Sequence, residues 1–160
     1  MDNVSQNLLD LDDKKRIDDL KSKQIEELNF WLNIKENPWR GFNPDEWRNA
    51  HIHFKQYSLI YINRSIEDLK NKIVIEIGCG PAGIVPFLKN TTAIGVDPLI
   101  DEYKKLWDLS NDNVKYIKSE IESFNCSISA DIVICWNVLD HVSDIELAIK
   151  KINNIIKTEG

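Results

Sequence analysis

The stretch IVIEIGCGPAG, residues 73–83, decides the fold. An aliphatic run of Ile and Val leads into three glycines spaced Gly-x-Gly-x-x-Gly, at Gly78, Gly80 and Gly83. Gly78 permits a sharp turn, Gly80 lets the backbone lie against a ligand, and Gly83 lets a following helix pack close to the strand. The stretch therefore predicts a strand, a turn at a binding site, and a helix.

The chain beyond Lys72 alternates short apolar runs with helical patterns, which is typical of a parallel sheet with crossover helices. No clear helix is expected between the third and fourth strands. Right-handed crossovers predict the spatial order 3-2-1-4, with a ligand site where the order reverses beside the first strand. The expected strands are residues 73–77, 92–96, 114–118 and 131–136, and the expected helices are residues 84–89 and 101–109.

The first 70 residues lack this alternation and read as helices. Apolar side chains recur at three- and four-residue steps over residues 12–36, which predicts an amphipathic helix ended by Asn37-Pro38. Residues 39–44 read as an ordered loop. A second helix is expected to begin at Asn43 or Pro44 and to run toward Leu69.

The acid at Glu76 narrows the choice of ligand. The glycine turn alone also resembles the fingerprint of FAD-binding proteins, and NAD enzymes share the spacing. A carboxylate two residues before Gly78 would repel the pyrophosphate of either cofactor, whereas it suits a cationic group. With this acid, the segment resembles the first motif of class I S-adenosylmethionine-dependent methyltransferases, and the resemblance implies S-adenosylmethionine as the cofactor.

Three further segments fit the same family. Asp97 follows the second expected strand, where a carboxylate can accept hydrogen bonds from both ribose hydroxyls, and Pro98 can cover the adenine. Glu120 and Ile121 stand where the family binds the adenine amino group and ring, with Glu122 as a competing acid. Residues 130–144 resemble the fourth motif. The cofactor-binding residues implied are Glu76, Gly78, Cys79, Gly80, Asp97, Pro98, Glu120, Ile121 and Asn137.

The resemblance covers residues 71–160 and implies a Rossmann-like α/β domain there, with residues 1–70 as an N-terminal helical cap. The final residues, 156–160, look like the turn that precedes the family's fifth strand. We therefore expect an incomplete methyltransferase sheet in a truncated chain. The fourth strand would then be a free edge, which the leading helices or a second copy in a homodimer would cover.

The sequence does not identify the catalytic residues. Alignment of a methyl acceptor with the sulfonium can suffice for transfer, and a general base helps a hydroxyl or amine acceptor. His141 is the weak candidate for that base, and a structural role competes with it. The three cysteines form no C-x-x-C pair, and His51 and His53 are poorly spaced for a shared ion, so no metal site is expected.

Composition limits the partners. The net charge of −6 and the pI near 5.1 argue against nucleic acid. The polar N-terminus and the absence of a run of roughly 18 apolar residues predict no signal peptide, no membrane span and a cytoplasmic location. The expected function is methyl transfer to a small molecule. The alternatives are a catalytically incomplete cofactor-binding fragment and, less favoured, an FAD- or NAD-dependent oxidoreductase.

Overall fold

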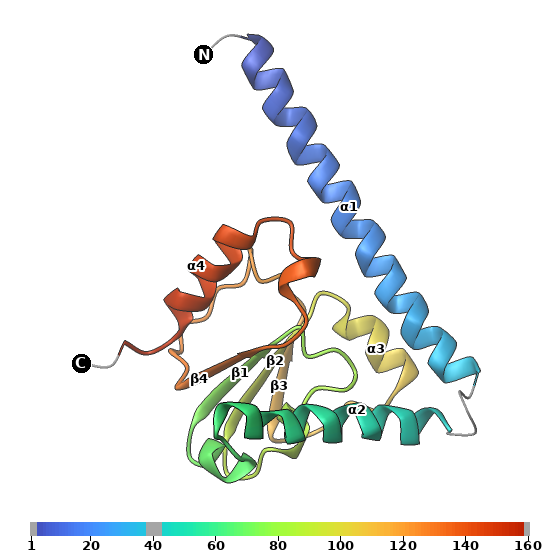
Figure 1. The fold of residues 1–160 in the computed structure, drawn as a ribbon, viewed down its shortest axis with the longest axis vertical. Coiled ribbons are helices and arrows are strands. Elements are labelled where there is room, and N and C mark those ends of the chain that lie inside the picture. Colours follow the sequence, from blue (N-terminus) through green and yellow to red (C-terminus); the bar gives the residue numbers. More distant parts are fainter. Residues whose placement is uncertain (1–2, 38–42, 159–160) are drawn as a thin grey trace.

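The computed structural model describes residues 3–37 and 43–158, with side chains from residue 14 onward. A four-stranded parallel sheet lies between helices, and the N-terminal half of α1 extends beyond the rest of the molecule (Figure 1). The longer elements are α1 Asn3–Glu36, α2 Pro44–Ser58, β1 Ile73–Ile77, β2 Thr92–Val96, α3 Ile100–Leu106, β3 Val114–Ile117, β4 Ile132–Cys135 and α4 Ile145–Ile155. The 3₁₀ helices are η1 Leu59–Ile62, η2 Ile66–Leu69, η3 Val85–Phe87 and η4 Leu139–His141.

The sheet has the order β3-β2-β1-β4, and every pairing is parallel. The predicted order 3-2-1-4 and the Rossmann-like α/β class are confirmed. Ile77 pairs with Val96 of β2 and with Cys135 of β4. The carboxyl ends of these strands are therefore level, and the loops that follow them leave from one edge of the sheet.

Alternation along β1 sends its side chains to two apolar clusters. Val74 belongs to a cluster with Trp31 of α1 and Ile52 of α2, on the face that also carries α3. Ile75 and Ile77 belong to a second cluster, which includes residues of α4 and of the segment before β4. Glu76 shares the face of Val74, so its carboxylate meets α2.

One expected helix is wrong, and a second begins as expected but ends early. Residues 84–89 form only η3, because the backbone becomes extended at Leu88, with ψ of 118°, and turns left-handed at Asn90, with φ of 55°. The second leading helix ends at Ser58 and passes into η1, and Asn63, with φ of 52°, ends η1. The 3₁₀ helix η2 restarts behind a capping box at Ser65.

The remaining boundaries differ less from expectation. β1 and β2 have the expected bounds, β3 and β4 are shorter than expected, and α1 begins at Asn3 rather than at residue 12. Of the expected loop at residues 39–44, residues 39–42 lie outside the described residues, and α2 begins at Pro44 behind the N-cap Asn43, as expected. Between β3 and β4 the structure describes no helix, as expected. No described helix has both the length and the apolar character needed to cross a membrane.

Candidate cofactor site

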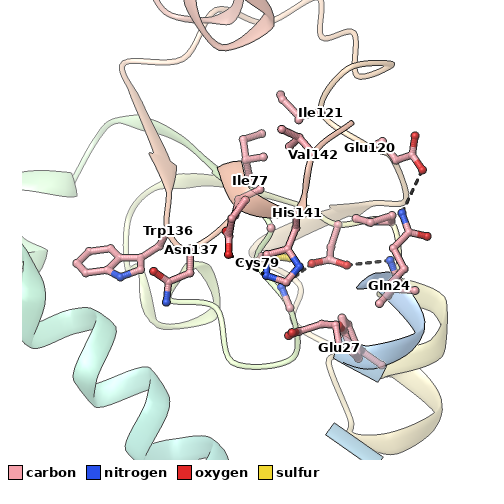
Figure 2. Close-up of a pocket in the computed structure, with 18 of the residues that line it drawn as sticks. Gln24, Glu27, Ile77, Cys79, Glu120, Ile121, Trp136, Asn137, His141 and Val142 are labelled. Atoms are coloured by element: carbon pink, nitrogen blue, oxygen red, sulfur yellow. Dashed lines mark hydrogen bonds and ion pairs between the residues drawn. The ribbon is translucent and has the colours of Figure 1, made fainter. Parts of the chain in front are cut away.

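A cavity of about 610 Å³ opens at the carboxyl edge of the sheet (Figure 2). Its volume falls within the range of roughly 300–1,000 Å³ that is usual for small-molecule sites. One wall consists of loops that follow the strands, and we call it the sheet wall. The opposite wall consists of side chains from α1 and α2, and we call it the helix wall. The sheet wall includes Gly78, Gly80, Asp97, Glu120 and Asn137.

The glycine turn adopts a backbone that other residues would strain. Gly78 and Gly80 have φ of 63° and 55°. A Cβ on Gly78 would stand 2.3 Å from Val138 Cγ2, so the turn packs tightly against the chain after β4. A Cβ on Gly80 would meet no atom within 4 Å and would project into open space. Gly80 therefore leaves room for a ligand against its backbone.

Glu76 is fully buried and already has partners. Its Oε2 accepts hydrogen bonds from the backbone N–H groups of Ile84 at 2.8 Å and Val85 at 3.2 Å. Its Oε1 lies 3.2 Å from Nζ of Lys55 on α2. Burial raises the pKa of Glu76, and the Lys55 ammonium opposes that rise. Among the described residues Lys55 lines the cavity and Glu76 does not, so the ammonium of Lys55 is the charge of this pair that reaches the cavity.

Asp97 ties the second strand to the glycine turn. Its Oδ2 accepts from Gly80 N–H at 2.9 Å, and its Oδ1 accepts from Leu99 N–H at 2.8 Å. Each carboxylate oxygen has a second lone pair available for a ligand. Burial raises the pKa of Asp97 to about 6 despite these bonds. Pro98 and the buried Cys79 line the cavity beside it.

The two acids after β3 have different surroundings. Glu122 accepts from Ser143 N–H at 2.6 Å and from Asp144 N–H at 3.2 Å, so it holds the start of α4. Glu120 instead accepts from the side-chain amide of Gln24 at 3.1 Å, across the cavity on α1. Both acids line the cavity, as does the buried Ile121. Of the two, Glu120 is less committed to the fold.

The segment after β4 brings the remaining candidates to the cavity. Asn137 has φ of 52° and lines the cavity with Trp136. His141, in η4, also lines it, with Nε2 at 3.4 Å from Asp140 Oδ2 and a side chain that is 42% exposed. Figure 2 shows Asn137 and His141 reaching the cavity from the same segment. Every cofactor-binding residue expected from the sequence except Glu76 lines this cavity.

The sequence predicted a helical cap in this region but did not identify the polar side chains with which α1 lines the cavity. Leu20, Gln24, Glu27 and Trp31 follow one face of α1 and line the cavity. Trp31 Nε1 donates to Glu27 Oε1 at 2.7 Å, and Lys23 donates to the backbone carbonyl of Asp140. One feature of the sequence could have identified these side chains. Gln24 and Glu27 are polar, although they lie on the apolar face of α1 that was expected to pack against the domain.

Other side chains of the leading helices have structural contacts. The His51 ring stacks on Trp47 with centroids 3.9 Å apart, and its Nδ1 lies 3.3 Å from Trp47 O. Burial lowers the pKa of His51, which also lines the cavity. His53 is exposed. Within residues 14–37 and 43–158, no group of three His, Cys, Asp or Glu side chains is arranged to hold a metal ion.

Residues 50–160 match the model of a family described as methyltransferase domain. The chain belongs to this family. Two ubiquinone biosynthesis O-methyltransferases from strains of Rickettsia bellii are 28% identical to this methyltransferase domain over 109 residues. That match covers 65% of the chain and 45% of each relative, so the chain spans less than half the length of these curated relatives.

Solved structures share the fold of this methyltransferase domain. Magnesium protoporphyrin IX methyltransferase from Synechocystis PCC 6803, solved with bound SAM, has a TM-score of 0.60 and 16% identity, covering 91% of this chain and 72% of that one. Coclaurine N-methyltransferase has a TM-score of 0.51 and 16% identity, covering 97% and 56%. A methyltransferase structure from Methanococcus maripaludis has a TM-score of 0.53 and 21% identity, covering 69% and 53%.

Proposed function

We propose that this methyltransferase domain binds S-adenosylmethionine in the cavity and takes part in methyl transfer to a small-molecule acceptor. The strongest support for the proposal is the way three ligand-binding groups converge on the cavity. The open backbone at Gly80, the Asp97 carboxylate and the Glu120 carboxylate come from three separate loops and face one cavity. These groups match a ligand that has a ribose diol, an adenine amino group and a chain that passes over the turn.

The charges around the cavity fit this cofactor. Five acids line it, namely Glu27, Asp97, Glu120, Glu122 and Asp140, whereas Lys55 is the one Lys or Arg among the described lining residues. S-adenosylmethionine carries a sulfonium, an ammonium and one carboxylate. We assign the carboxylate to Lys55. A pyrophosphate would meet mainly like charges, so an FAD- or NAD-dependent oxidoreductase is not favoured.

The bound cofactor would supply a methyl group that is already activated by the adjacent sulfonium. The chain's own residues would orient the cofactor and limit water through the helix wall. His141 is the candidate to take a proton from the acceptor, since it is a titratable group at the cavity after β4. A small acceptor is supported by the size of the cavity and by the small molecules named for coclaurine and magnesium protoporphyrin methyltransferases.

The organisation of the chain is part of the same proposal. Residues 1–70 would act as a cap, because α1 and α2 supply the helix wall, and residues 71–160 would supply the sheet wall. A second copy at the free side of β4, the absence of a nucleic-acid partner and the cytoplasmic location stay predictions. The alternative of a cofactor-binding fragment without turnover would show binding and no methylated product.

Calorimetric titration of the 160-residue chain with S-adenosylmethionine and S-adenosylhomocysteine tests the proposal. We expect micromolar binding that Asp97→Ala and Gly80→Val abolish. Asp112→Ala is the matched control, because Asp112 is exposed and lies outside the cavity lining, and this variant should bind normally. Absence of binding by the unmutated chain, or equal binding by all the variants, would overturn the proposed function. Binding of FAD or NADH in its place would favour the oxidoreductase.

A further inference from the structure

Gln24 of α1 faces the acid that the sequence assigns to adenine. Its Nε2 lies 3.1 Å from Oε1 of Glu120, although the two residues are 96 positions apart in the chain. Both side chains are partly buried and line the cavity, and Figure 2 shows the bond between them at one end of it. We propose that Gln24 and Glu120 form a composite adenine-recognition site, in which Gln24 donates to a ring nitrogen next to the amino group.

An acceptor and a donor side by side complement one edge of adenine. The 6-amino group donates, and the ring nitrogens on either side of it, N1 and N7, accept. An ionised carboxylate only accepts, so Glu120 can bind the amino group but neither ring nitrogen. A glutamine amide has two N–H bonds, and Glu120 uses one of them. The second N–H makes a donor available beside the Glu120 acceptor.

This arrangement discriminates between purines. Hypoxanthine carries an oxygen in place of the amino group and is protonated at N1, so it would turn an acceptor toward the Glu120 carboxylate. That places two acceptors, the purine oxygen and the Glu120 carboxylate, face to face where adenine would make a hydrogen bond. The Gln24–Glu120 pair therefore favours adenosyl over inosyl ligands. Glu122 does not form a comparable pair, because Ser143 and Asp144 already donate to its Oε1.

The position of Gln24 is fixed from both sides along α1. Trp31, two turns further on, is 5% exposed and packs edge-on against Trp107 with ring centroids 5.7 Å apart. Lys23, its neighbour, donates to the Asp140 carbonyl, and Leu20, one turn earlier, is buried. The amide is therefore held at the cavity by contacts that do not involve the ligand. Preorganisation of this kind reduces the entropic cost of binding.

The inference rests on the proposed function, and one set of titrations separates the two. The ligands are S-adenosylhomocysteine, its 1-deaza and 7-deaza analogues, and S-inosylhomocysteine. The proteins are the unmutated chain, Gln24→Met, and Asn29→Met as a control at an exposed amide of α1 outside the cavity lining. Methionine keeps the length and helix propensity of glutamine but removes the donor. Circular dichroism checks that each variant is folded.

We expect Gln24→Met to weaken S-adenosylhomocysteine roughly tenfold, as loss of one hydrogen bond predicts, and Asn29→Met to change nothing. One deaza analogue should bind the unmutated chain roughly tenfold more weakly and lose nothing further in Gln24→Met, which identifies the ring nitrogen involved. The preference over S-inosylhomocysteine should shrink in the same variant. Equal weakening of all four ligands, or none, would overturn the inference while leaving cofactor binding in place. No binding to the unmutated chain would overturn the proposed function as well.

Discussion

The two walls of the cavity are built differently. The sheet wall is held by backbone hydrogen bonds, such as Gly78 N–H to Val96 O at 2.8 Å, and by buried side chains such as Asp97. The helix wall is attached through side chains of α1, among them Gln24 and Lys23. We therefore expect changes at buried groups of either wall to cost stability, and a change at the partly buried Gln24 to alter mainly ligand affinity.

The bond between Lys55 and Glu76 joins the helix wall to β1, and breaking it should have the largest effect. Lys55→Met leaves a fully buried carboxylate without its cation, which typically costs about 3–5 kcal/mol. Urea unfolding of both proteins measures the loss. Adding Glu76→Gln to Lys55→Met should recover part of it, because the uncompensated charge is then removed. A loss below about 1 kcal/mol would show that this bond does not hold the helix wall to the sheet.

The raised pKa of Asp97 should make the stability of the sheet wall depend on pH. Its ordinary pKa is 3.8 and its folded value is about 6, so the folded protein binds more protons between these values than the unfolded chain. The contribution of Asp97 to the free energy of unfolding is therefore fully present below about pH 4. It is lost as the pH rises through 6, and the loss amounts to about 3 kcal/mol.

Urea unfolding between pH 4 and pH 8 measures this loss of stability. Asp97→Asn should not show the loss, whereas the control Asp112→Asn should show it. Cofactor affinity should rise over the same range in the unmutated chain, since only the ionised carboxylate accepts from both ribose hydroxyls. If the unmutated chain instead gained stability relative to Asp97→Asn as the pH rises from 4 to 8, the raised pKa of Asp97 would be refuted.

A smaller effect is expected in the helix wall. Trp31→Phe keeps the aromatic contact but removes the N–H that donates to Glu27, which should cost about 1 kcal/mol. Trp107→Phe is the matched control, because the buried Nε1 of Trp107 has no hydrogen-bond partner among the described residues. That variant should be less destabilising. Equal losses in urea unfolding would mean that packing alone, and not the bond to Glu27, sets the contribution of Trp31.

The sequence predicted the sheet wall better than the helix wall, for a physical reason. Strand bounds and sheet order follow from apolar runs, glycine positions and the handedness of crossovers, all of which are local or general. The contact of Gln24 with Glu120 depends on how α1 packs against the domain, which no local pattern specifies. The expected helix at residues 84–89 is only the short η3, because the chain becomes extended at Leu88 and left-handed at Asn90 where it turns toward β2.

The contacts that close the cavity join residues that are far apart in the sequence, and this affects the order in which the chain can fold. Lys23 and Asp140 are 117 positions apart, and Gln24 and Glu120 are 96 apart, whereas β1 and β2 are neighbours in sequence. Loop closure over such distances is entropically costly, so the pairing of β1 with β2 can precede it. On the ribosome, α1 emerges before the sheet but cannot make both contacts until residue 140 has been synthesised, so the helix wall closes only after β1 and β2 are available to pair.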